Sequence, residues 1–301
     1  MRIAWIGLGN MGEPMAGRLA AAGHDVKGFD LKPDARERAE ALNITFAETA
    51  AEAAADAEVV ITMLPNGGLV KKVLEGGVLD AAPADAVVID CSTTDIQDAK
   101  DVHELVSGTG RRFYDAPVSG GTTGAEAGTL TFMVGATEEE LGELADVIDV
   151  MAGKIFYLGT PSLGQAAKIC NNLMLGVSLA GLCEGVALAE KLGVDHHTFY
   201  ELAKVSSGDS WPLRTWYPVA GVTQTGAVNR DFQGGFAVDL LSKDLGLALS
   251  AAEANDVRMP HVQAVQDALG EISKAGYGGR DSAVLMRYVD GTLNTLDGEN
   301  A

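Results

Sequence analysis

The stretch GLGNMG at residues 7–12 constrains the fold of this chain more than any other feature. It follows a short apolar run over residues 3–6 that is typical of a buried strand, and a helical pattern over residues 13–22 follows it. A second strand pattern covers residues 25–30. Glycines at this spacing permit a tight turn, close approach of another molecule to the backbone, and close helix–strand packing. The stretch therefore predicts a strand–turn–helix–strand unit that opens a parallel sheet.

Such a unit is the usual context for binding a dinucleotide, because the free N–H groups at the helix start attract a pyrophosphate. The predicted contacts in this loop are Gly7, Leu8, Gly9, Asn10, Met11 and Gly12. Asp30, at the end of the second predicted strand, would hold the hydroxyls of the adenosine ribose and repel a 2′-phosphate. NAD is therefore favoured over NADP, although Lys32 keeps NADP open. A purely structural glycine turn and a plain turn aspartate are the alternatives.

Two further strand patterns, over residues 58–64 and 87–91, each end in turn-forming residues. In a doubly wound sheet, the loops after the carboxyl ends of the strands line the ligand crevice. Leu64, Pro65 and Thr93 are therefore predicted to flank the cofactor. Polar loops of this kind are also common without a ligand.

A strand pattern from residue 113 runs into Ser119, Gly120 and Gly121, where bare backbone N–H groups and one hydroxyl could surround a carboxylate. Gly124 and Gly128 predict an open loop before two further strands, over residues 131–134 and 154–158. A glycine-rich hairpin without a ligand is the alternative interpretation.

From residue 164 the pattern changes from strands to helices. A long helix is predicted over about residues 164–192, Asp195 is a plausible cap for the next one, and residues 238–255 and 260–274 are helical again. The predicted fold class is α/β. It has a Rossmann-like doubly wound domain over residues 1–163, and an all-helical domain over residues 164–301 that begins with a long interdomain helix.

Lys168 and Asn172 are spaced i and i+4, so they share one face of that helix. Transfer of a hydride from an alcohol needs a group that accepts the hydroxyl proton. The histidines, which are the usual choice, fall in helix ends or polar turns: His24, His103, His196, His197 and His261. Lys168 remains as the acid/base, with Asn172 to bind the substrate or orient the ammonium. The pKa of an ordinary lysine lies about three units above neutral pH, so burial or a nearby cation such as Lys243 would have to lower it. A solvated helix lysine is the alternative.

The composition narrows the function further. The formal net charge of −20 leaves no basic surface for nucleic acid. Three cysteines without metal spacing indicate reduced thiols, and no site for a metal is predicted. No signal peptide is expected before the first strand, and no apolar run is expected to reach membrane-spanning length. A cytoplasmic enzyme that does not act at a membrane is the expectation.

Four segments together resemble the β-hydroxyacid dehydrogenases, and in particular the branch that acts on 3-hydroxyisobutyrate. They are the cofactor loop, the substrate signature DAPVSGG at residues 115–121, the catalytic-lysine segment at 164–172, and KDLGLA at 243–248. The resemblance covers nearly the whole chain.

The resemblance implies that Lys168 is catalytic and that Lys243 contacts the nicotinamide end of the cofactor. It also implies a substrate site of Ser119, Gly120, Gly121, Asn172 and Trp211. The implied activity is NAD-linked oxidation of 3-hydroxyisobutyrate to methylmalonate semialdehyde in valine breakdown, by a homodimer or homotetramer. A broader enzyme acting on 3-hydroxypropionate, serine or tartronate semialdehyde is the alternative, followed by a nucleotide-binding module without catalysis.

Overall fold

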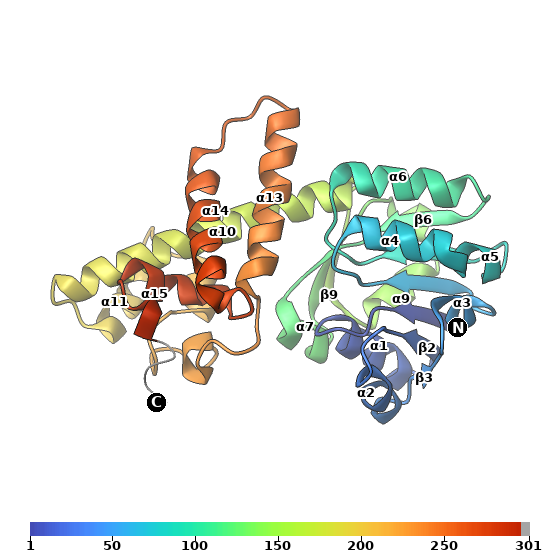
Figure 1. Cartoon of the computed structure of the whole chain (residues 1–301), viewed down its shortest axis with the longest axis horizontal. Helices are drawn as coiled ribbons and strands as arrows, with labels where there is room; N and C mark the ends of the chain where they lie inside the picture. Colours follow the sequence, from blue (N-terminus) through green and yellow to red (C-terminus); the bar gives the residue numbers. More distant parts are fainter. Residues whose placement is uncertain (296–301) are drawn as a thin grey trace. The chain divides into compact units, whose positions relative to one another are not determined.

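The computed structural model describes residues 1–295, and it divides into two compact units, Met1–Lys168 and Ile169–Ala301. The first unit contains a parallel sheet (Figure 1). Its six strands lie in the order β3-β2-β1-β4-β5-β6. The strands are β1 (Arg2–Ile6), β2 (Asp25–Phe29), β3 (Thr45–Phe46), β4 (Val59–Thr62), β5 (Val87–Asp90) and β6 (Arg112–Asp115). This is the strand order of doubly wound dinucleotide-binding sheets, which confirms the predicted fold class.

Both faces of this sheet are buried. Successive side chains along a strand point to opposite faces, so each strand contributes to two apolar cores. Ile3 and Trp5 enter one apolar core and Ala4 and Ile6 enter another. The first core includes residues of α1 (Gly12–Ala21) and α2 (Ala35–Ala41). The second includes residues of α3 (Ala50–Ala54), α4 (Gly67–Val73), the π-type turn η1 (Leu74–Val78), α5 (Leu79–Ala81) and α6 (Ile96–Ser107). Because helices cover both faces of the sheet, a ligand can reach it only at the ends of the strands.

A smaller sheet follows in the same unit, with the order β7-β8-β9. Its strands are β7 (Val118–Ser119), β8 (Leu130–Val134) and β9 (Ala152–Tyr157), with α8 (Glu138–Leu141) and α9 (Leu144–Asp149) between the last two. The open loop predicted around Gly124 is wrong. Residues Gly121–Ala127 form a helix, α7, which Gly128 ends with a φ of +67°. Gly124 is buried in that helix, and a Cβ there would lie 3.1 Å from Leu130 Cδ2. Glycine at this position therefore allows the helix to pack closely against Leu130.

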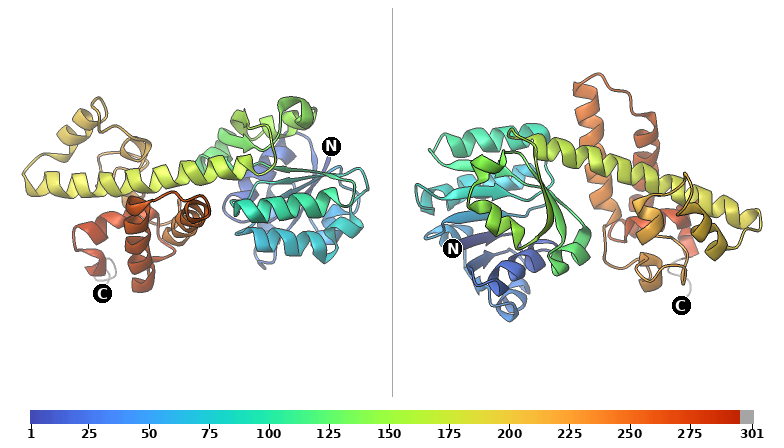
Figure 2. Two further views of the ribbon diagram at one scale, coloured as in Figure 1. Left: turned by 90° about the horizontal axis from the view of Figure 1, so that it is seen from above. Right: turned by 180° about the vertical axis from the view of Figure 1, so that it is seen from behind.

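The long helix α10 spans Leu163–Lys191 and matches the predicted range within one residue at each end (Figure 2). The expectation that no apolar run reaches membrane-spanning length is wrong for α10. It is 29 residues long, and an 18-residue window has a mean hydropathy of 1.6. Core helices of globular proteins pass the same test, and 39% of that window is buried. The buried polar residues Gln165, Lys168 and Asn172 are typical of a helix packed inside a protein.

The second unit is helical throughout its described part, where one isolated bridge, Ala237 to Asp281, is the only β pairing. Its helices after α10 are α11 (His196–Ala203), α12 (Trp211–Thr215), η2 (Ala227–Arg230), α13 (Val238–Ala254), α14 (Pro260–Ile272), η3 (Ser273–Tyr277), η4 (Ser282–Val284), α15 (Leu285–Val289) and η5 (Leu293–Thr295). Asp195 caps α11 by accepting the Thr198 N–H, as predicted. Helices α13 and α14 pack side by side (Figure 1). The predicted all-helical C-terminal part is confirmed.

Candidate active site

The glycine loop between β1 and α1 has the geometry that a dinucleotide requires. Gly7 has a φ of +103°, and a Cβ there would lie 2.2 Å from the Met63 carbonyl oxygen. A Cβ at Gly12 would lie 1.9 Å from the carbonyl oxygen of Gly7. By contrast, a Cβ at Gly9 would meet nothing within 4 Å. Gly7 and Gly12 are therefore fixed by packing inside the protein, whereas the space beside Gly9 is open for a ligand that approaches the backbone.

Asp30 follows β2 and faces this loop. Its Oδ2 accepts the Leu8 N–H at 2.8 Å, and its Oδ1 accepts the Lys32 N–H at 2.8 Å. Each carboxylate oxygen can accept more than one hydrogen bond, so these contacts leave capacity for ribose hydroxyls. The carboxylate also presents negative charge where a 2′-phosphate would have to bind. The residues present thus fit NAD.

The loops after β4 and β5 meet at the same edge of the sheet. The Leu64 N–H donates to Ser92 Oγ at 2.8 Å, which holds Leu64 and Pro65 near Thr93. Asp90 at the end of β5 accepts hydrogen bonds from Thr62 Oγ1 at 2.8 Å and from the Ser92 N–H at 3.0 Å. Complete burial raises the pKa of Asp90 to about 6, although these hydrogen bonds oppose the rise. The predicted cofactor residues of unit one therefore gather on one sheet edge.

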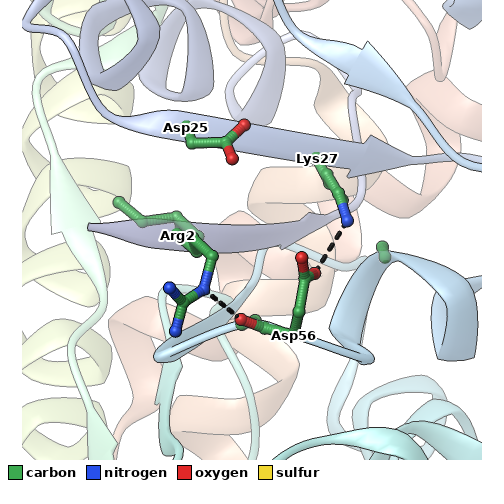
Figure 3. Close-up of a pocket in the computed structure, with 7 residues that line it drawn as sticks. Arg2, Asp25, Lys27 and Asp56 are labelled. Carbon is green, nitrogen blue, oxygen red and sulfur yellow. Dashed lines mark hydrogen bonds and ion pairs between the residues drawn. The ribbon is translucent and has the colours of Figure 1, made fainter.

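The opposite, amino-terminal edge of the sheet is closed by polar contacts (Figure 3). Asp56 accepts a hydrogen bond from Lys27 Nζ at 2.7 Å, and its carbonyl oxygen accepts one from Arg2 Nε at 2.6 Å. The small pocket between these side chains leaves no room for a ligand. These contacts tie β1 and β2 to the turn before β4, and their role is structural.

The turn after β7 contains the predicted carboxylate contacts Ser119, Gly120 and Gly121. Gly120 has a φ of +139° and Gly121 a φ of +64°, so both occupy backbone conformations that favour glycine. A Cβ at Gly121 would meet nothing within 4 Å, and both glycines are exposed. The backbone of this turn is therefore open to a small anion, beside the half-buried Ser119 side chain.

Lys168 and Asn172 lie on one face of α10 together with Gln165, at positions i, i+3 and i+7. Their exposed fractions are only 8% for Lys168, 1% for Asn172 and 0% for Gln165. A lysine this buried on a helix is unusual, so the alternative of a solvated helix lysine is excluded.

Asn172 is held by a carboxylate that the sequence did not single out. Its Nδ2 donates to Asp244 Oδ2 at 2.6 Å, and Lys243 Nζ lies 3.1 Å from Asp244 Oδ1. The second contact is an ion pair. Asp244 is 3% exposed and belongs to α13. Lys243 was predicted as a cofactor contact, and its neighbour Asp244 could have been found only by knowing which side of α13 faces α10.

Trp211, the remaining predicted substrate residue, is the first residue of α12. Its ring centroid lies 5.0 Å from that of Trp216, which in turn lies 6.5 Å from that of Phe236. The Trp211 side chain is half exposed. It is thus the outermost member of an aromatic cluster in the C-terminal unit and has a free apolar surface.

A cavity of about 370 Å³ occurs elsewhere in the C-terminal unit, near the carboxyl end of α10. Its lining includes Glu190, His196, Met286 and Arg287, and none of the predicted site residues. Among residues 1–295, no group of histidine, cysteine or acidic side chains is arranged to hold a metal ion.

Comparisons with known proteins agree with this geometry. Residues 2–159 match the family model for the NAD binding domain of 6-phosphogluconate dehydrogenase. Residues 162–289 match the model described as NAD-binding of NADP-dependent 3-hydroxyisobutyrate dehydrogenase.

Individual relatives match over most of their length. The 3-hydroxyisobutyrate dehydrogenase of Pseudomonas aeruginosa is 42% identical, over 86% of this chain and 87% of the relative. The NAD-dependent L-serine dehydrogenase of the same organism is 38% identical, over 97% of this chain and 98% of the relative. The structure of Mycobacterium tuberculosis 3-hydroxyisobutyrate dehydrogenase with L-serine superposes with a TM-score of 0.88 at 41% identity, covering 95% of this chain and 97% of that one. The chain therefore belongs to the β-hydroxyacid dehydrogenase family, among the 3-hydroxyisobutyrate dehydrogenases, and is an NAD-dependent dehydrogenase.

Proposed function

We propose that the enzyme oxidises 3-hydroxyisobutyrate to methylmalonate semialdehyde in valine catabolism, with Lys168 as the acid/base. The observation that carries this proposal is the burial of Lys168 on the same helix face as Asn172, whose amide is held by Asp244. The names of the relatives at 41–42% identity support the substrate.

In this mechanism, bound NAD⁺ supplies the hydride acceptor. The neutral amine of Lys168 would take the proton of the substrate hydroxyl at Nζ. The carbon that bears this hydroxyl would lose its hydride to the bound cofactor, so that the alcohol becomes an aldehyde. Ser119, Gly120 and Gly121 bind the substrate carboxylate through the hydroxyl and backbone N–H groups. Asn172 orients the reacting oxygen, and Trp211 covers the apolar part of the substrate. Only 8% of Lys168 is exposed, so its amine lies in a site with little access for water.

Replacing Lys168 by alanine tests the acid/base role. We expect kcat to fall by about 10²–10⁴-fold, because proton transfer by a positioned group contributes about that much. The dissociation constant of NAD⁺, followed by fluorescence titration, should change by less than about threefold. Lys191→Ala provides a matched control, since Lys191 is an exposed lysine at the other end of α10. A kcat of Lys168→Ala within about tenfold of the wild type refutes the mechanism.

L-Serine is the second candidate substrate, because the relative of Pseudomonas aeruginosa named NAD-dependent L-serine dehydrogenase is 38% identical over nearly the whole chain. It has the same hydroxymethyl and carboxylate groups as 3-hydroxyisobutyrate, with an ammonium in place of a methyl group. These two candidates are separated by comparing kcat/KM for the NAD⁺-linked oxidation of 3-hydroxyisobutyrate, 3-hydroxypropionate and L-serine, and by measuring the NADH-linked reduction of tartronate semialdehyde. A methyl group in an apolar pocket contributes about 10-fold or more, so a smaller preference for 3-hydroxyisobutyrate over L-serine would favour the broader enzyme.

We also propose a homodimer or homotetramer in the cytoplasm. Met174 and Leu188 on α10 are 67% and 60% exposed, which supports burial of this apolar helix against a second copy. Light scattering coupled to size-exclusion chromatography measures the mass directly, and a monomer at micromolar concentration contradicts this part of the proposal.

A further inference from the structure

The start of α10 is held by a buried carboxylate from another element. Asp115, the last residue of β6, is fully buried. Its Oδ1 accepts the Ser162 N–H at 2.8 Å, and its Oδ2 accepts the Gln165 N–H at 3.0 Å. Burial raises the pKa of the Asp115 carboxyl, while these backbone donors lower it. Asp115 therefore caps the amino terminus of the helix that carries Lys168.

The surrounding backbone makes room for this cap. A Cβ at Gly135 would lie 2.1 Å from Asp115 Oδ1, and one at Gly164 would lie 2.7 Å from Asp115 Oδ2. Ser162, immediately before the helix, is buried and has a φ of +72°, which is a strained conformation for a residue with a side chain. A strained residue between close contacts indicates that the position of the helix start is tightly determined.

Gln165 connects this helix start to the loops at the cofactor edge of the sheet. Its Oε1 accepts the Thr94 N–H at 3.0 Å, and its Nε2 donates to the Ser92 carbonyl oxygen at 2.7 Å. Thr93, a predicted cofactor contact, lies between these two residues in the chain. Ser92 also accepts the Leu64 N–H. One fully buried side chain thus links α10 directly to the loop after β5, and Ser92 of that loop in turn holds the loop after β4.

We infer that Gln165 is a positioning residue for Lys168. The inference rests on the proposed acid/base role of Lys168. Gln165 and Lys168 are three residues apart on one helix face, so a rotation or shift of the first turn moves the lysine amine directly. Gln165 fixes that turn to the loop around Thr93, and therefore sets the distance between the proton acceptor and the loop that flanks the cofactor. Displacements of about 1 Å in such geometry cost about 10²-fold in rate.

The first test is Gln165→Met, which keeps the length of the side chain and removes both hydrogen bonds. We expect kcat to fall by about 10–100-fold and the NAD⁺ dissociation constant to change by less than about threefold. The primary isotope effect on kcat, with deuterium on the hydroxyl-bearing carbon, should be at least as large as in the wild type. Gln97→Met is the matched control, because Gln97 is an exposed glutamine on α6 that donates to Asp101. An unchanged kcat, or a loss confined to NAD⁺ affinity, overturns the inference.

A double-mutant cycle separates this inference from the function on which it rests. In a Lys168→Ala background, Gln165→Met should cause less than about a twofold further loss, because its effect acts through the lysine. If Lys168→Ala retains activity, the proposed acid/base role fails. If Lys168→Ala loses kcat as expected, and Gln165→Met lowers the kcat of that variant by the same factor as it lowers the kcat of the wild type, only the positioning role fails.

Gln165→Glu provides a second variant that stands on its own if the methionine variant does not fold. Its carboxylate can still accept the Thr94 N–H but cannot donate to the Ser92 carbonyl oxygen, whereas the protonated acid can. The ratio of its kcat to that of the wild type should therefore rise as the pH falls from 8 toward 5. A ratio that stays flat over this range overturns the positioning role.

Discussion

Asp90 gives the N-terminal unit a stability that depends on pH in a defined direction. The carboxyl is completely buried at the end of β5, and burial raises its pKa from 3.8 to about 6. The folded state therefore holds this proton more tightly than the unfolded state does. The stabilisation is fully present below pH 3.8 and is lost as the pH rises through about 6. A shift of about two units corresponds to about 3 kcal/mol in the free energy of unfolding, of which about half is lost between pH 5 and 7.5.

Asp90→Asn removes the titration and keeps the shape. Both donors, Thr62 Oγ1 and the Ser92 N–H, bond to the same oxygen of Asp90, so an amide oxygen can accept both. The free energy of unfolding of the wild type minus that of the variant should fall by about 1 kcal/mol between pH 5 and 7.5. Urea unfolding is measured at each pH, with hydrogen exchange of peptides from β4 and β5 as the probe, so that the difference is obtained for the unit that carries Asp90.

Asp56→Asn is the control with the opposite sign. Asp56 accepts a hydrogen bond from Lys27, which lowers the pKa of this carboxyl. Its contribution to stability is present at neutral pH and is lost as the pH falls through the folded-state pKa. A difference for Asp90→Asn that is constant within about 0.3 kcal/mol, or that grows with pH, refutes the argument that burial dominates at this site.

Two further predictions concern the cofactor loop and the residue that holds Asn172. Gly9→Ala should fold with a Tm within about 2 °C of the wild type and bind NAD⁺ at least about tenfold more weakly, because its Cβ enters only the open space beside the loop. Gly12→Ala should instead lower the Tm, because its Cβ would lie 1.9 Å from the Gly7 carbonyl oxygen. Differential scanning fluorimetry and NAD⁺ titration distinguish the two, and equal destabilisation would contradict the structure. Asp244→Ala should lower kcat by about 10–100-fold with little change in NAD⁺ affinity, since Asn172 loses its partner; steady-state kinetics check this, and an unchanged kcat excludes Asp244 from the site.

Local sequence patterns were sufficient for the fold class. The strand–GLGNMG–helix unit, the apolar strands and the change to helices at residue 164 predicted a doubly wound sheet followed by a helical part, and the strand order confirms it. The edge strand β3 was not predicted because it has only two residues. Helix α7 was missed because its glycines read as loop residues, whereas Gly124 is needed for packing against Leu130. Short elements of this kind are decided by tertiary contacts, which local propensity does not contain.

The parts of the site that were not predicted from the sequence depend on contacts between elements that are distant in the chain. Asp115 stands in the segment DAPVSGG, where the neighbouring serine and glycines drew attention as substrate contacts. Its carboxylate instead caps a helix that begins 48 residues later, and it is fully buried. Gly135 and Gly164 leave space for that carboxylate, and nothing in the sequence linked either glycine to Asp115. A buried carboxylate is costly unless backbone donors reach it. Asp115 can therefore cap α10 only if Gly135 and Gly164 leave the space in which it meets those donors. Gly135→Ala should therefore displace the start of α10 and lower kcat, although Gly135 is not itself predicted to touch the substrate.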